Sequence, residues 1–185
     1  MSVPTKAARY VVIACAGAYG AMKLWWLLGG DLLKAQTPLP QDAQQNLLAG
    51  SPLTTASHGI TALLAAAAVL VAWSLGTGRA GRRVERLLRI GAVLVGVLMI
   101  VRAVGGLGFG FVGDALVLAG VISVGDPRYA DHVARWDLFL WAPYWLLFGV
   151  AWVSLAVATR SRHDDARHSG TVGPPRGGAG DAAAL

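Results

Sequence analysis

Four ionisable side chains of this sequence lie within or at the ends of strongly apolar stretches. They are Lys23, His58, Arg102 and Asp137. Because a charged side chain is costly to place in the hydrocarbon of a membrane, such residues often mark binding sites or proton pathways. A lysine and an arginine together can hold an anionic group, with an aspartate balancing the charge and a histidine donating a hydrogen bond. A histidine or an aspartate can instead act as the acid or base of an enzyme.

The four groups are expected at a similar depth. Lys23 and Arg102 each lie about six residues before the end of an apolar segment, or roughly 9 Å below one membrane surface at 1.5 Å per residue. His58 lies near the start of another segment, and Asp137 lies at the start of the last one. This common depth, more than any single residue, indicates a site in the outer part of a helix bundle.

Aromatic residues share helix faces with these groups. Residues three, four or seven apart lie on one face of an α-helix. Trp26 therefore shares a face with Lys23, and Trp141 and Tyr144 share a face with Asp137. The predicted ligand-binding residues are Lys23, Trp26, His58, Arg102, Asp137, Trp141 and Tyr144, with Trp25 and Trp136 as further walls of the cavity.

Each residue also has an ordinary structural explanation. Lysine and arginine near an interface can extend their charged ends to the headgroups, and interfacial tryptophans form aromatic belts. Asp137 can act as the N-cap of a helix, which aspartate does well. Arg102 can form an internal ion pair with Asp137 or with Asp114. These structural roles and a ligand-binding role remain open alternatives.

Apolar segments of membrane length must position these residues. Of the 185 residues, 55% are hydrophobic and 14% are charged, whereas soluble domains carry about 25% charged residues. A soluble enzyme or a disordered chain is therefore not expected. A spanning helix needs roughly 20 mostly apolar residues, and no segment alternates as membrane β-strands do. We predict an all-α fold, an integral membrane four-helix bundle with spans at about 10–29, 54–75, 88–108 and 138–158.

A glycine-rich break is expected after the third span. The stretch 105–113 contains five glycines, and glycine often terminates helices. Residues 114–124 are too few to cross a membrane, so they are predicted to form a short interfacial or re-entrant helix. The 30–53 loop and the 109–137 segment are expected to form an extracytoplasmic cap.

Lysines and arginines predict the orientation, because cytoplasmic loops carry an excess of them. Two lie at the N-terminus, five in the loop 76–89 and four at the C-terminal end, against three in the two loops on the other side. Both termini are therefore predicted to be cytoplasmic (N-in, C-in), in a bacterial cytoplasmic membrane. Residues 1–160 are predicted to form the transmembrane domain, and residues 161–185 a disordered cytoplasmic tail.

The sequence also limits the classes of partner. Cys15 is the single cysteine and the four histidines do not cluster, so neither a metal nor another cofactor is expected. The basic residues follow the membrane topology, so no nucleic acid is expected. The expected partners are the lipid bilayer and a lipid-like ligand or a membrane-protein partner, and an oligomer is compatible with the sequence. The favoured function is ligand binding. A membrane enzyme acting on a lipid-soluble substrate and a transporter protomer are the alternatives.

Three stretches carry a family resemblance: KLWWLLGGD at 23–31, VRAVGGLGFGF at 101–111 and ARWDLFLWAPYWLLFG at 134–149. Together they resemble the DUF3995 family of small four-helix bacterial membrane proteins. The resemblance implies the fold and the motifs of the outer half, and it implies no reaction. The sequence departs from the family pattern at Lys23, where a histidine is frequent, and at Trp145, where a cysteine is common. The matching positions are Trp26, Gly29, Gly30, Arg102, Ala103, Gly105, Asp137 and Pro143.

Overall fold

The computed structural model describes residues 3–77, 81–105 and 110–169, and all regular secondary structure in these residues is helical. Four helices are long and apolar enough to cross a membrane. The prediction of an all-α fold with four such helices is therefore confirmed for the described residues. The elements are α1 (Val3–Leu27), α2 (Gln41–Ala49), α3 (Pro52–Thr77), α4 (Arg82–Val104), α5 (Gly110–Leu118), α6 (Pro127–Trp136), the π-helical segment η1 (Asp137–Trp141) and α7 (Ala142–Ser169).

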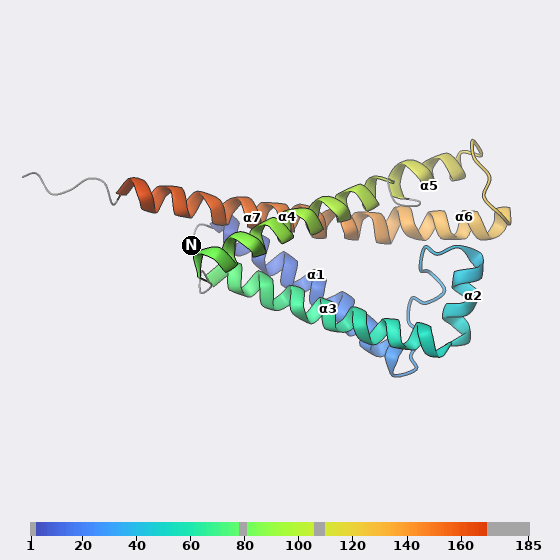
Figure 1. Cartoon of the computed structure of the whole chain (residues 1–185). Helices are drawn as coiled ribbons and strands as arrows, with labels where there is room; N and C mark the ends of the chain where they lie inside the picture. Colours follow the sequence, from blue (N-terminus) through green and yellow to red (C-terminus); the bar gives the residue numbers. More distant parts are fainter. Residues whose placement is uncertain (1–2, 78–80, 106–109, 170–185) are drawn as a thin grey trace, which may run out of the picture.

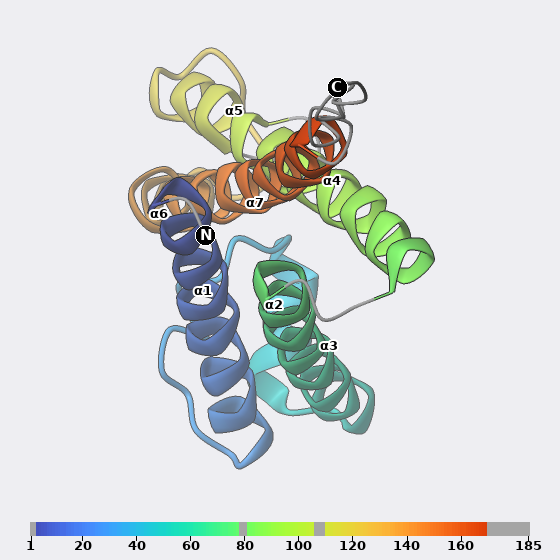
Figure 2. The same cartoon turned by 90° about the vertical axis from the view of Figure 1, so that its left-hand side faces the viewer.

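The long helices form two pairs that lie side by side. Helix α1 packs along α3, α4 packs along α7, and α1 also contacts α7 (Figures 1 and 2). Helices α3 and α4 have few contacts with each other, although they are consecutive in the chain. The shared core contains Val12 of α1, Leu75 of α3 and Leu155 of α7, none of which is exposed. The pairing of helices thus leaves one open side between α3 and α4.

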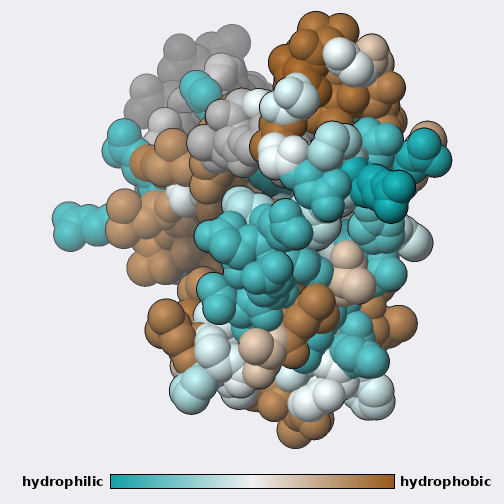
Figure 3. Space-filling view, turned by 90° about the vertical axis from the view of Figure 1, so that its right-hand side faces the viewer, coloured by the Kyte–Doolittle hydropathy of each residue, from teal (hydrophilic) through white to brown (hydrophobic). Residues whose placement is uncertain are grey.

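The short helices gather at one end of the bundle. Helices α2, α5 and α6 lie at the end opposite to the first residues of α1 and the last residues of α7 (Figure 1). The surface of this end is mostly hydrophilic, with an apolar patch over α5 and the turn that follows it (Figure 3). The exposed apolar residues there include Val112, Val121 and Ile122.

The glycine-rich break lies earlier than predicted. Helix α4 ends at Val104 rather than near residue 108, because Gly105 adopts a φ of +123° while its N–H still bonds to the Val101 carbonyl. Residues 106–109 lie outside the described residues. The short helix is present, but it spans Gly110–Leu118 rather than 114–124. It ends there because the chain turns at Gly120, whose φ is +70°.

The fourth spanning helix is longer than predicted at both ends. The chain is helical from Pro127, rather than from residue 138, through α6, η1 and α7. Asp126 caps its start by accepting the Arg128 N–H, and a proline follows a cap residue favourably. Asp137 is therefore inside the helix, and its predicted N-cap role is wrong. At the other end α7 runs to Ser169, past the predicted end of the span, and residues 170–185 of the predicted tail lie outside the described residues.

A single π-helical turn interrupts this helix next to Pro143. Pro143 has no N–H, so it cannot donate to the carbonyl four residues earlier. The residue before it, Ala142, donates its N–H to the Asp137 carbonyl five residues back, which is the hydrogen-bond pattern of a π-turn. Such π-turns inside α-helices frequently occur at functional sites. Here the turn begins at Asp137 and ends at Trp141, two of the predicted site residues.

Two glycines allow α4 and α7 to approach closely. A Cβ atom added to Gly149 would lie 2.6 Å from the Gly96 carbonyl oxygen, and one added to Gly96 would lie 2.8 Å from the Gly149 carbonyl oxygen. Small residues at helix crossings permit this backbone contact in membrane proteins. By contrast, a Cβ on Gly91, also in α4, would meet no heavy atom within 4 Å.

The replacement Gly149→Ala is therefore expected to lower the free energy of unfolding by about 1–3 kcal/mol, the usual cost of overpacking. The measurement is helicity by circular dichroism during denaturant titration in detergent. Gly91→Ala is the control, and it is expected to leave stability unchanged or slightly higher. Equal stability of the two variants would show that the α4–α7 crossing does not need this contact.

Candidate functional site

A buried ion pair joins the π-turn to α4. The Arg102 Nη2 donates to both carboxylate oxygens of Asp137, at 3.0 Å each. The Gly110 N–H donates to Asp137 Oδ2 at 2.8 Å. The Asp137 side chain is fully buried, whereas the Arg102 side chain is 20% exposed. The carboxylate thus holds α4 and the start of α5 against the fourth spanning helix.

A second carboxyl group lies beside this pair. Asp114 of α5 is fully buried, and its carboxyl group lies next to the Asp137 carboxylate and the Gly110 N–H. Burial and the neighbouring Asp137 raise the pKa of Asp114 to about 8, against the opposing effects of Arg102 and the Gly110 N–H. Asp114 therefore carries a proton at neutral pH. The sequence placed it only as an alternative partner of Arg102.

Lys23 points into the bundle. Its Nζ lies 3.9 Å from the ring centroid of Trp26 and 5.2 Å from that of Tyr19, which are cation–π distances. Lys23 and Arg102 line the same cavity, which has a volume of about 380 Å³. The other residues that line it are Tyr19, Trp26, Thr37, Pro38, Leu39, Leu98, Met99, Trp141 and Trp145.

The segment between α1 and α2 closes this cavity from one side. Trp26 Nε1 donates to the Leu32 carbonyl, and Trp141 Nε1 donates to the Gln36 carbonyl, both at 2.6 Å. The Tyr129 hydroxyl donates to the Leu39 carbonyl at 2.8 Å. The predicted cap is therefore fixed directly to two tryptophans that line the cavity.

The remaining predicted site residues lie elsewhere. His58 is buried and packs edge-on against Trp26, with ring centroids 5.2 Å apart, and it does not line the cavity. Tyr144 donates its hydroxyl to the Cys15 carbonyl of α1 at 2.9 Å. It lines a neighbouring cavity together with Trp25. Trp136 is 37% exposed and is not among the residues that line this cavity.

Two aromatic residues connect the site to a larger apolar cavity. Tyr19 and Trp145 line both the Lys23 cavity and a second one of about 490 Å³ between α3 and α4. The Tyr19 and Trp145 rings pack edge to face, with centroids 5.2 Å apart. Neither residue was among the predicted site residues. Helical spacing places Tyr19 on the face of Lys23, four residues earlier, and Trp145 on the face of Trp141, four residues later.

Among the described residues, no group of three or more His, Cys, Asp and Glu side chains could hold a metal ion. The chemical groups of the site are thus two cations, one ionised carboxylate, one protonated carboxyl and a set of aromatic rings. This arrangement suits the binding of an anion next to apolar surface.

The stability of the protein is expected to fall as the pH rises from about 4 to about 8. The folded chain holds the Asp114 proton up to about pH 8, whereas the unfolded chain releases it near 3.8, so deprotonation favours unfolding across this interval. Denaturant titration in detergent at several pH values measures the slope. Asp114→Asn should reduce the slope and Asp31→Asn, an exposed control, should not. An unchanged slope in Asp114→Asn would contradict the assignment.

The replacement Arg102→Gln is expected to lower the free energy of unfolding by about 3–5 kcal/mol, because it leaves the buried Asp137 carboxylate without its partner. The double variant Arg102→Gln/Asp137→Asn should recover part of this loss. Arg135→Gln, an exposed arginine two residues from Asp137, is the control. Additive losses in the double variant would contradict a direct interaction.

A family model matches most of the chain. The model described as "Protein of unknown function (DUF3995)" matches residues 16–152, which include all seven predicted site residues. Comparison with curated proteins finds no significant match, and comparison with solved structures finds none. The resemblance noted in the three sequence stretches is confirmed: the chain belongs to the DUF3995 family.

Proposed function

We propose that this protein binds an amphiphilic lipid with an acidic head group. The head group contacts Lys23 and Arg102, and an apolar chain lies in the cavity between α3 and α4. The observation that carries this proposal is the presence of both cations in one aromatic-lined cavity that borders the larger apolar one.

The charges favour one anion as ligand. Lys23 and Arg102 contribute two positive charges and Asp137 one negative charge, while the Asp114 carboxyl is neutral at pH 7. Together, the groups that line the cavity and the buried carboxyl groups behind Arg102 carry one positive charge in excess. In addition, Arg102 Nη1 is buried and has no hydrogen-bond partner among the described residues. A buried guanidinium N–H without a partner is costly, and an acidic ligand would satisfy it.

The apolar cavity suits a hydrocarbon chain. Its volume of about 490 Å³ lies within the usual range of ligand pockets, about 300–1,000 Å³. Its lining includes Leu64 of α3 and Leu87 of α4, both largely exposed. Because α3 and α4 have few contacts, a chain could enter sideways from the bilayer. Tyr19 and Trp145 then lie where head and chain meet.

We further propose that the protein spans a cell membrane with both termini on the cytoplasmic side. The four membrane-length helices support a membrane location. The excess of basic residues at the end that carries the start of α1 and the end of α7 supports this orientation. The lipid site then lies in the outer half of the membrane, below the cap.

The positions of the two candidate acid–base residues, Asp137 and His58, favour binding over catalysis. Asp137 accepts hydrogen bonds from Arg102 and Gly110, and His58 lies behind Trp26 rather than in the cavity. Neither side chain lines the cavity. The alternative of a transporter protomer has no specific observation among the described residues to support it over binding.

Quenching of tryptophan fluorescence by a brominated fatty acid tests the proposal, because Trp26, Trp141 and Trp145 line the cavity. Lys23→Gln is expected to weaken binding about tenfold, equivalent to ~1.4 kcal/mol. Lys6→Gln, an exposed lysine at the other end of α1, is the control with the same change of charge.

Two further measurements separate the contribution of the acidic head group from that of the hydrocarbon chain. The methyl ester of the same fatty acid should bind weakly to both proteins, because it has no charge. Gly91→Phe should block the chain without a clash, since Gly91 lines the apolar cavity and faces open space. Equal binding of acid and ester, or unchanged binding to both Lys23→Gln and Gly91→Phe, would overturn the proposed function.

A further inference from the structure

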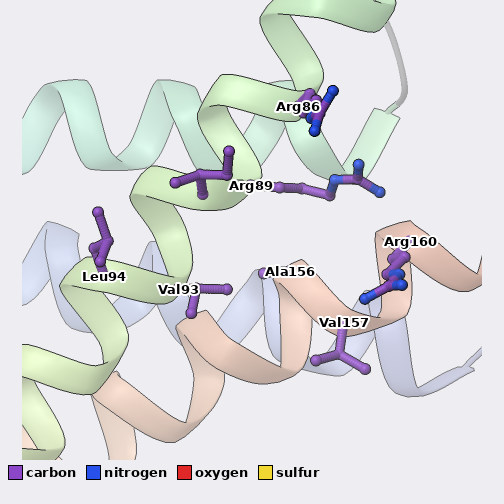
Figure 4. Close-up of a pocket in the computed structure, with 8 residues that line it drawn as sticks. Arg86, Arg89, Val93, Leu94, Ala156, Val157 and Arg160 are labelled. Carbon is purple, nitrogen blue, oxygen red and sulfur yellow. The ribbon is translucent and has the colours of Figure 1, made fainter.

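A second basic groove lies at the opposite end of the molecule, between α4 and α7. Arg86 and Arg89 extend from the first turns of α4, and Arg160 extends from α7 (Figure 4). The groove has a volume of about 540 Å³. Although residues 89 and 160 are far apart in sequence, the packing of α4 along α7 brings them to one groove.

The groove is amphipathic along its length. Its guanidinium groups gather toward one end, and Val93 and Leu94 lie toward the other (Figure 4). Ile90, Ala156 and Val157 complete the apolar lining. Such an arrangement offers cations for a head group and an apolar surface for a hydrocarbon chain.

The side chains that line the groove include three arginines and no aspartate or glutamate. Glu85, the acidic residue adjacent to Arg86, is buried and does not line the groove. Three cations that share one groove repel one another unless an anion binds. The planar guanidinium group matches a phosphate with two parallel hydrogen bonds.

We infer that the α4–α7 groove binds an anionic phospholipid, with its phosphate at Arg86, Arg89 and Arg160 and one acyl chain along the apolar lining. The site is separate from the Lys23 cavity, which lies toward the cap and is lined by other residues. In the orientation proposed above it faces the inner leaflet. Basic pockets between spanning helices on that side are suited to acidic head groups.

Native mass spectrometry of the full chain in detergent tests this inference, with phosphatidylglycerol and phosphatidylcholine of identical acyl chains as probes. The Lys23→Gln background is used throughout, so that the first proposed site contributes less to binding. The test variant is Arg89→Gln/Arg160→Gln. The matched control is Arg82→Gln/Arg83→Gln, which removes two exposed arginines of α4 outside the groove. Circular dichroism checks the helicity of each variant.

Phosphatidylglycerol is expected to bind more tightly than phosphatidylcholine. Each arginine removed from the groove should weaken phosphatidylglycerol binding about fivefold, equivalent to ~1 kcal/mol, and the control pair should bind as the parent does. If the double variant fails to fold, Arg160→Gln and Arg160→Lys replace it. The lysine is expected to recover only part of the binding.

Three outcomes overturn the inference. One is equal binding of the two lipids, and another is the same loss in the control pair as in the groove variant. The third is displacement of phosphatidylglycerol by inorganic phosphate at equal concentration, because the acyl chain would then contribute nothing. Loss of fatty acid binding in Lys23→Gln alone bears only on the first site.

Discussion

The buried ion pair between Arg102 and Asp137 organises the capped end of this protein. Removing both charges from water is costly, and the cost is offset only if the remaining hydrogen-bonding capacity is met. The Gly110 N–H supplies a further donor to the carboxylate, which requires a glycine at a φ of +76° in close approach to the α4 backbone. The π-turn at Asp137, the end of α4 and the start of α5 therefore form one unit.

Uneven helix packing determines where a ligand could bind. Gly96 and Gly149 bring α4 and α7 into backbone contact, whereas α3 and α4 separate and leave an apolar cavity between them. In the neighbouring cavity Lys23 lies over the rings of Trp26 and Tyr19 at cation–π distances. Two tryptophans that line the site also hold the cap through their indole N–H groups. The same tryptophan, Trp26, thus contacts the Lys23 cation, lines the cavity and holds the cap.

Much of the fold could be predicted because membrane-spanning helices have local signals. Length and apolar content located the four long helices, and the glycines after residue 104 predicted the break before a short helix. Their bounds were less accurate. The Asp126-Pro127 cap, eleven residues before the predicted start of the fourth span, was missed because the residues after it are polar. A polar helix that leads into an apolar one is not detected by a search for apolar segments.

The sequence by itself determined the family, the four spans and the faces that Lys23 shares with Trp26, because helical periodicity and apolar length are local properties of the chain. Only the tertiary structure decided that Arg102 pairs with Asp137, that Asp114 lies beside them, and that His58 packs behind Trp26 instead of lining the cavity. Depth along a helix can be counted from residue numbers. The rotation of each helix about its axis, and its choice of neighbours, is set by packing between segments that are distant in the chain.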